Sequence, residues 1–217
     1  MRIVAGTFKG RTIAAPAGAA TRPTSDRVRE ALMSALASMR GGFDDAVVLD
    51  AFAGSGALGL EALSRGAARA WFFERDRVAA RSLEANIAAC GVSRDRVRLV
   101  RADVQKAPPV NARPPFDLVF FDPPYVQGVA GSVRLACTLA RAGALRPGVI
   151  AAFEHEQAAS AELVRGLKSS GLEPAAQKKY GKTGVTLVRM DFPDDVLHRG
   201  SLEFDDVCKA GEERQKP

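Results

Sequence analysis

The sequence predicts an α/β protein with a mostly parallel, doubly wound sheet. Two observations support this fold class. Short apolar stretches rich in β-branched and aromatic residues alternate with stretches whose apolar residues recur at helical spacing. A glycine-rich segment at residues 54–59 also joins an apolar stretch to a helical one, as in the parallel sheets that bind nucleotides. The parallel strands are expected at residues 46–50, 70–74, 97–101, 117–121 and 148–153.

The first 40 residues predict a small basic extension made of a β-hairpin and a helix. Residues 2–5 and 11–14 have strand-like composition, and glycines mark a turn between them. Thr24 or Ser25 can cap a helix whose apolar residues form a stripe from residue 28 to residue 36. We therefore divide the chain into an extension at 1–40, a main domain at 41–190 and a tail at 191–217.

The first strand of the main domain ends in a carboxylate that precedes the glycines. Residues 50–59 read D-A-F-A-G-S-G-A-L-G, which contains the pattern G-x-G-x-x-G. A pyrophosphate at a helix N-terminus gains nothing from a neighbouring carboxylate, whereas a cationic ligand does. S-adenosylmethionine carries an ammonium and a sulfonium group and no phosphate, so Asp50 favours this cofactor over NAD. The candidate cofactor-binding residues here are Asp50, Phe52, Gly54, Ser55 and Gly56.

The next two expected strands also lead to acids. Glu74 follows the second strand, about 20 residues after the glycines, where a carboxylate that binds ribose hydroxyls belongs for either cofactor. Asp103 follows the third strand and could accept a hydrogen bond from an adenine amino group. It could equally be the N-cap of a helix that begins at Val104, and the sequence leaves both interpretations open.

The fourth strand is followed by the tetrapeptide Asp122-Pro123-Pro124-Tyr125. Proline lacks a backbone N–H and fixes φ, so the strand ends here and the tetrapeptide lies at the sheet edge where open α/β sheets bind ligands. The Asp122 carboxylate and the carbonyls of Asp122 and Pro123 would suit an exocyclic amino group, and Tyr125 offers a face on which a base could stack. Without the glycine motif, the tetrapeptide would indicate only a strand-terminating turn.

The end of the main domain predicts an antiparallel hairpin that closes the sheet. Its strands are expected at residues 177–180 and 185–190, around a turn at 181–184. Residues 191–217 carry eight acids against four bases and show no apolar periodicity, so we interpret them as an acidic tail.

The composition is ordinary for a globular protein. The chain has 217 residues, of which 47% are hydrophobic and 26% charged, which suits one α/β domain with a small appendage. No apolar run approaches membrane-spanning length, and the N-terminus breaks too early for a signal peptide, so we expect a cytoplasmic monomer with no membrane partner. The three cysteines and two histidines lack metal-ligand spacing, so no metal site is expected.

Basic residues gather near the N-terminus. The net charge of the chain is +6, and residues 1–40 hold seven bases against two acids. This extension is therefore the candidate phosphate-binding surface, although a solvated charged face is the usual alternative. The candidate residues are Arg2, Lys9, Arg11, Arg22 and Arg27.

In combination, these motifs resemble the RsmD-type bacterial methyltransferases. The likeness rests on D-x-F-x-G-S-G-x-x-G at residues 50–59, D-P-P-Y at 122–125, R-I-V-A-G at 2–6 and R-P-T-S-D-R-V-R-E-A-L at 22–32. The last stretch is the most family-specific, and the acidic tail is not covered. The resemblance implies a Rossmann-like class I methyltransferase fold. It also implies methyl transfer from S-adenosylmethionine to the exocyclic N2 of a guanine in 16S ribosomal RNA, within the small subunit or an assembly intermediate.

The resemblance also implies a role for each motif. The glycine segment would approach the methionine end of the donor, Glu74 would take the ribose hydroxyls and Asp103 the adenine. Asp122 and the Pro123 carbonyl would hold the target amine, Tyr125 would stack on the flipped base, and the basic extension would contact the RNA.

Three other functions remain open. An adenine-N6 methyltransferase acting on DNA or RNA would also use D-P-P-Y, but the stretch at residues 22–32 and the lack of a separate DNA-recognition domain argue against it. An NAD-dependent oxidoreductase would fit G-x-G-x-x-G, but Asp50 and D-P-P-Y argue against it. A non-catalytic RNA-binding module is disfavoured by the intact acceptor motif.

Overall fold

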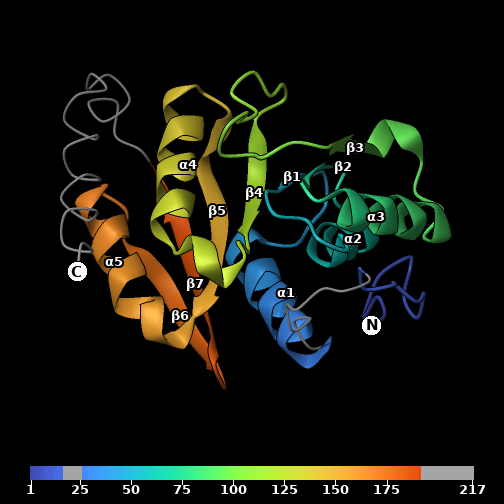
Figure 1. Cartoon of the computed structure of the whole chain (residues 1–217), viewed down its shortest axis with the longest axis horizontal. Helices are drawn as coiled ribbons and strands as arrows, with labels where there is room; N and C mark the ends of the chain where they lie inside the picture. Colours follow the sequence, from blue (N-terminus) through green and yellow to red (C-terminus); the bar gives the residue numbers. More distant parts are fainter. Residues whose placement is uncertain (17–25, 192–217) are drawn as a thin grey trace.

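The computed structural model describes residues 1–16 and 26–191, in which strands and helices alternate (Figure 1). The strands are β1 (Val47–Asp50), β2 (Arg69–Phe73), β3 (Val97–Val100), β4 (Phe116–Phe121), β5 (Leu145–Glu156), β6 (Pro174–Tyr180) and β7 (Thr183–Met190). The α-helices are α1 (Asp26–Arg40), α2 (Ala57–Ser64), α3 (Arg77–Ala89), α4 (Ala130–Arg141) and α5 (Ser160–Ser169). Short 3-10 turns lie at Arg94–Arg96, Tyr125–Gln127 and Gln157–Ala159.

All seven strands belong to one mixed sheet of order β3-β2-β1-β4-β5-β7-β6. The first five are parallel, and β7 pairs antiparallel with both β5 and β6, so the α/β class and the closing hairpin are confirmed. The strand order reverses between β1 and β4. In an open α/β sheet, the crevice outside the carboxyl ends of the strands at such a reversal is where ligands bind.

Helices cover both faces of this sheet (Figure 1). Leucines of α1, α2 and α3 pack with one face, and leucines of α4 and α5 pack with the other. All six residues of the central strand β4 are buried, which explains why its sequence is continuously apolar instead of alternating. The site therefore rests on a sheet that is fixed from both sides.

The N-terminal residues pack onto this framework. Ile3, Phe8 and Ile13 are buried in the same core cluster as α1 and the α1–α3 face of the sheet. A single antiparallel bridge joins Arg2 and Thr12, so the expected N-terminal hairpin is present as one bridge and not as two strands. The Ile3 and Ile13 N–H groups bond across this bridge, to Arg11 O and Met1 O, both at 2.9 Å. Those of Val4, Ala5, Phe8 and Ala14 bond to side chains of α2 and α3, as described below.

Two remaining expectations from the sequence concern membrane-spanning segments and the acidic tail. Within the described residues, none of the helices combines the length and apolar character that a membrane crossing requires. The acidic tail at 191–217 lies outside the described residues except for Asp191.

Candidate functional site

The glycine turn connects β1 to α2 with very close packing. The Gly59 N–H donates to the Asp50 carboxylate at 3.0 Å, which ties the helix start to the strand end. A Cβ on Gly59 would lie 2.3 Å from the Phe72 ring, and a Cβ on Gly56, where φ is +79°, would lie 2.2 Å from Leu83. A larger residue at either position would displace the Phe72 or Leu83 side chain. The fingerprint therefore brings backbone N–H groups close to the sheet edge.

Asp50 is buried at the end of β1, with 2% of its surface exposed. Burial raises the pKa of Asp50 to about 7; the Gly59 N–H opposes this shift and the nearby Glu74 adds to it. The ionised form of this carboxyl group is therefore costly while no cation is near. An ammonium or sulfonium group would relieve that cost, which matches the cationic ligand expected from the sequence.

Glu74 lies directly after β2 and is held by two backbone groups. Its Oε2 accepts from Gly54 N at 2.8 Å, and its Oε1 accepts from Asp76 N at 2.7 Å. These contacts fix the carboxylate beside the glycine turn. Each carboxylate oxygen can accept more than one hydrogen bond, so ribose hydroxyls could still bind here.

Asp103 follows β3, and its carboxylate already has two partners. Oδ1 accepts from Gln105 N at 2.9 Å, and Oδ2 pairs with the Arg75 guanidinium at 3.3 Å. The expected alternative, a helix N-cap, is wrong in one respect: the carboxylate caps a turn, and no helix begins at Val104. The ion pair with Arg75 is a contact that sequence reasoning missed.

The carboxyl ends of β1, β4 and β5 carry three acids on one face. The parallel register pairs Phe121 with Phe153, so Asp122 and Glu154 follow side by side on adjacent strands. Because side chains alternate along a strand, Asp50, Asp122 and Glu154 all lie on the face that α1–α3 cover. Glu154 is buried, with 7% of its surface exposed, and Asp122 is partly exposed at the edge.

Asp122 lies in the field of the other two carboxylates. Burial raises the pKa of Asp122 well above its usual range, and Glu154 and then Asp50 raise it further. A group of this kind gains most from ligands that donate hydrogen bonds or carry positive charge. Glu154 was missed from the sequence; the only signal was an acid directly after the apolar stretch at residues 148–153.

The chain turns sharply after Asp122. Pro123 is buried, and Gln127 N donates to the Pro124 carbonyl at 2.9 Å, which forms the 3-10 turn at Tyr125–Gln127. The stiff turn that the prolines predict is therefore present, and it stops β4 at the sheet edge. The Tyr125 side chain lies outside what the structure describes, so its expected stacking role stays a prediction.

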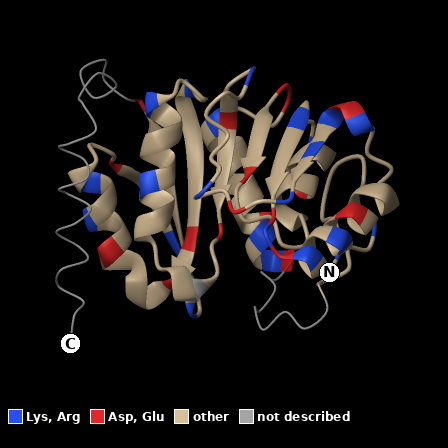
Figure 2. Cartoon of the chain, turned by 45° about the horizontal axis from the view of Figure 1, so that its top comes forward, with Lys and Arg blue, Asp and Glu red and all other residues tan. Residues whose placement is uncertain are grey.

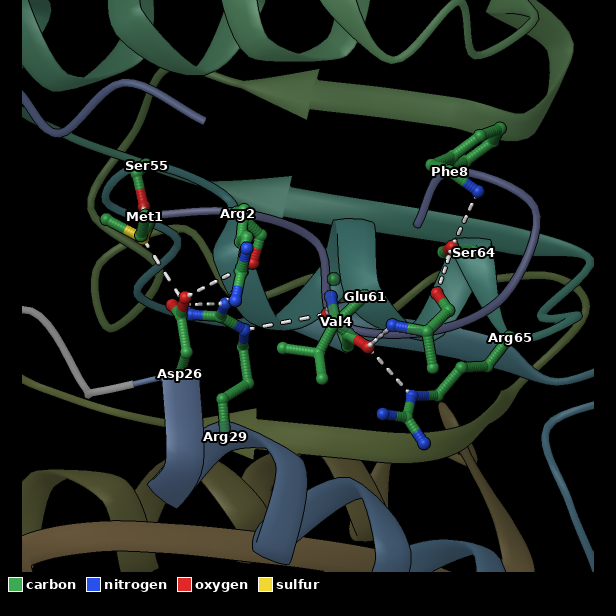
Figure 3. A network of polar contacts seen from close by, with 12 residues as sticks. Met1, Arg2, Val4, Phe8, Asp26, Arg29, Ser55, Glu61, Ser64 and Arg65 are labelled. Atoms are coloured by element: carbon green, nitrogen blue, oxygen red, sulfur yellow. Dashed lines mark hydrogen bonds and ion pairs between the residues drawn. The ribbon is translucent and has the colours of Figure 1, made fainter. Parts of the chain in front are cut away.

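A buried polar network fastens the N-terminal segment to α1 and α2 (Figure 3). Glu61 of α2 is fully buried and accepts from Val4 N at 2.8 Å and from Ala5 N at 3.0 Å. The same carboxylate lies 2.9 Å from the Arg65 guanidinium and 3.6 Å from that of Arg29, which is also fully buried. A buried charge of this kind is tolerated only when it is paired. Nothing in the sequence indicates that these charges are internal.

The N-terminal segment also reaches the glycine turn through Asn86 of α3. The Asn86 amide nitrogen donates to Ala14 O at 3.0 Å and to Ser55 O at 2.9 Å, and its oxygen accepts from Ala14 N at 2.9 Å. Met1 also contacts the glycine turn, because its sulfur lies 3.8 Å from the Ser55 hydroxyl (Figure 3). The segment that carries the candidate phosphate contacts is thus bonded to the candidate cofactor turn.

The candidate phosphate-binding residues differ in whether their side chains already bind other parts of the chain. Arg11 donates to Ala89 O at 3.1 Å and lies over the Phe8 ring, and Arg2 is exposed but pairs with Asp26 at 3.7 Å. Lys9 and Arg27 are exposed, and Arg22 lies outside the described residues. Figure 2 shows basic segments around the N-terminus with acidic segments among them.

A second polar region lies at the opposite edge of the sheet. A cavity of about 350 Å³ there is lined by residues that include Arg40, Asp117, Arg146 and Arg189. These arginines bind the chain itself: Arg146 pairs with Asp117 at 3.0 Å, and the other two donate to backbone carbonyls at and just beyond the end of α1. We interpret this cavity as structural and separate from the carboxyl-end site.

The fold and the edge motifs place this chain in the class of Rossmann-like methyltransferases. The chain belongs to the family described as Conserved hypothetical protein 95, whose model matches residues 1–189, and the resemblance to RsmD-type proteins is confirmed. It is 43% identical over 132 residues to the Ribosomal RNA small subunit methyltransferase D of Escherichia coli K12. That alignment covers 59% of this chain and 62% of the relative, which is less than two thirds of its length.

Other relatives agree with this assignment. The Ribosomal RNA small subunit methyltransferase D of Haemophilus influenzae is 36% identical over 141 residues, which cover 63% of this chain and 70% of that protein. Among solved structures, the Escherichia coli protein yhhF, described as a candidate methyltransferase, superposes with a TM-score of 0.70 at 32% identity. The superposition covers 89% of this chain and 99% of yhhF.

Proposed function

We propose that this protein transfers a methyl group from S-adenosylmethionine to the exocyclic N2 of a guanine in small-subunit ribosomal RNA. The observation that carries the proposal is the position of Asp122. It opens the D-P-P-Y turn on β4, next to the β1 end that carries Asp50 and the glycine turn. Donor and acceptor can therefore meet at the point where the strand order reverses.

The residues present fit S-adenosylmethionine. Asp50 offers a buried carboxylate for the cationic end, the glycine turn allows a close approach, and Glu74 is fixed where ribose hydroxyls would lie. Asp103 would receive the adenine, beside its ion pair with Arg75. When bound, this cofactor supplies an electrophilic methyl group on a sulfonium, which leaves as a neutral thioether.

Asp122 and its neighbours would prepare the acceptor amine. The N2 lone pair of guanine is delocalised into the ring, so a hydrogen bond from N2 to the Asp122 carboxylate favours a pyramidal, nucleophilic nitrogen. The negative charge of Asp122 also stabilises the positive charge that develops on N2 as the new N–C bond forms. Because its pKa is raised, Asp122 is suited to take the proton that N2 then releases.

The proposed substrate class follows from the relatives and the charge. Proteins that share 34–43% of aligned residues with this chain are named Ribosomal RNA small subunit methyltransferase D. Exposed bases such as Lys9 and Arg27 flank the N-terminal segment, where they could bind RNA phosphates. The target base would leave its stack to reach the sheet edge.

Two measurements test the proposal. Calorimetric titration should detect binding of S-adenosylmethionine and none of NADH, and the reverse would favour the oxidoreductase. Incubation with labelled S-adenosylmethionine and small ribosomal subunits from a strain that lacks the activity should label the N2 of one guanine. Label on an adenine N6 would instead select the alternative methyltransferase.

A further inference from the structure

Glu154 is a buried carboxylate that has no role in the methyl transfer proposed above. It lies near the carboxyl end of β5, beside the D-P-P-Y turn, on the same face of the sheet as Asp122. Its negative charge is, after burial, the second cause of the raised pKa of Asp122. A carboxylate has about four acceptor sites, so Glu154 can accept a hydrogen bond from a ligand in addition to the interactions it makes within the chain.

The order of the strands indicates what would come near Glu154. Along the sheet edge, Asp103, Glu74 and Asp50 follow β3, β2 and β1, which is the direction from the adenine to the sulfonium end of the proposed donor. Asp122 follows on β4, where the amine would accept the methyl group. Continuing in the same direction, the rest of the target base would extend toward β5 and Glu154.

The chemistry of guanine suits two neighbouring carboxylates. Its Watson–Crick edge carries two adjacent donors, the N2 amino group and N1–H, whereas N1 of adenine has no hydrogen and is an acceptor. Resting on the proposed function, we propose that Glu154 is the specificity-determining residue that accepts a hydrogen bond from N1–H of the target guanine, while Asp122 holds N2.

This assignment explains how the site rejects bases without N1–H. A base whose N1 carries a lone pair would face the Glu154 carboxylate with two acceptors in contact, which is unfavourable. Guanine would instead place one N–H against each member of the Asp122–Glu154 pair. The repulsion between these carboxylates, which adds to the effect of burial on the pKa of Asp122, is then offset by the substrate itself.

The test compares guanine with 2-aminopurine, which keeps the 2-amino group but has no hydrogen on N1. Small-subunit RNA, or particles reconstituted from it, would carry either base at the mapped position. For the wild-type protein we expect methylation of guanine, measured as kcat/KM, to exceed that of 2-aminopurine by about 10- to 100-fold, the range for a hydrogen bond to a charged group. Glu154→Gln should bring this ratio near one, because its amide can present either an oxygen or an N–H to N1.

Control measurements distinguish a wrong assignment of Glu154 from a wrong proposed function. Glu156→Gln changes an exposed glutamate two residues further on and should leave the ratio at the wild-type value. Calorimetric binding of S-adenosylmethionine by Glu154→Gln shows that the variant is folded. A Glu154→Gln ratio equal to the wild-type ratio, or a wild-type protein that methylates both bases equally well, overturns this assignment and leaves the proposed function standing. A wild-type protein that methylates neither base overturns the proposed function and this assignment with it.

Discussion

At the scale of single residues, the site consists of acids whose charge is costly until a ligand arrives. Asp50 and Asp122 both have raised pKa values, and burial is the largest cause in each case. Glu74, in contrast, is held by two backbone N–H groups. In the proposed complex, Asp50 and Asp122 would face the reacting groups, and Glu74 would face a neutral ribose. The difference in environment thus follows the difference in the charge of the proposed ligand.

The raised pKa of Asp50 predicts how stability depends on pH. The folded protein keeps a proton on Asp50 up to about pH 7, whereas the ordinary pKa of an aspartate in the unfolded chain is 3.8. The folded state therefore binds more protons between these values, and stability falls as pH rises from about 4 to 7. At about 1.4 kcal/mol per pKa unit, the loss is roughly 4 kcal/mol.

Asp50→Asn should remove this part of the pH dependence. Denaturant unfolding of both proteins, without ligand, at several pH values from 4 to 8 measures it. The two stability curves should diverge, with the variant gaining on the wild type as pH rises to 7. Parallel curves would show that Asp50 ionises normally in the folded protein.

At the scale of elements, the N-terminal segment is fastened to the elements that carry the proposed donor site. It is bonded to α2 through Glu61 and to the glycine turn through Asn86. Truncating Asn86 leaves the buried Ser55 carbonyl without this partner and removes two partly buried bonds to Ala14, whose carbonyl keeps the Ser82 hydroxyl. The unsatisfied buried carbonyl costs about 1–3 kcal/mol.

Asn86→Ala should therefore lower the melting temperature and weaken donor binding together. At about 2–4 °C for each kcal/mol, the melting temperature should fall by several degrees. Asn111→Ala, at an exposed asparagine, is the matched control and should change neither quantity. Scanning calorimetry and titration with S-adenosylmethionine measure both effects; a stability loss with unchanged donor affinity would mean that the turn is positioned without the segment.

The exposed bases of the same region predict a salt effect. Arg2 and Arg11 already have partners in this chain, so Lys9 and Arg27 are the cleaner candidates for phosphate contacts. Replacing both by Ala should weaken RNA binding and flatten its dependence on salt by up to roughly 0.7 per lost single-strand phosphate contact. Replacing the exposed Arg165 and Lys168 of α5 by Ala serves as the control with equal charge change. An equal loss of slope in both variants would make the effect one of net charge alone.

At the scale of the whole molecule, local patterns predicted the sheet but not the contacts between distant segments. The apolar run before Asp122 and the glycines after Asp50 each carry their own signal, so these strand ends were found from the sequence. Glu61 and Asn86 lie in helices, and nothing near them in the sequence shows that they bind a segment more than 50 residues away. Glu154 became visible only when the register placed it beside Asp122.

Contacts between distant segments also explain the two elements that differ from the sequence prediction. The segment after Asp103 has an acid at a plausible cap position, but Arg75 and Gln105 use that carboxylate in a turn. The N-terminal hairpin is reduced to one bridge because side chains of α2 and α3 bind the neighbouring N–H groups of Val4, Ala5 and Ala14. In both cases tertiary contacts decided the outcome over local propensity.

In the proposed mechanism, Asp122 holds the acceptor amine and other residues hold the donor. The most direct measurement is the single-turnover rate of methyl transfer by Asp122→Ala, together with its affinity for S-adenosylmethionine. Loss of one such electrostatic contact typically costs about 10²–10³-fold in rate, so we expect a fall of that size. Donor affinity should stay within a few-fold of the wild-type value, which also shows that the variant is folded. Near-normal turnover by Asp122→Ala would contradict the account.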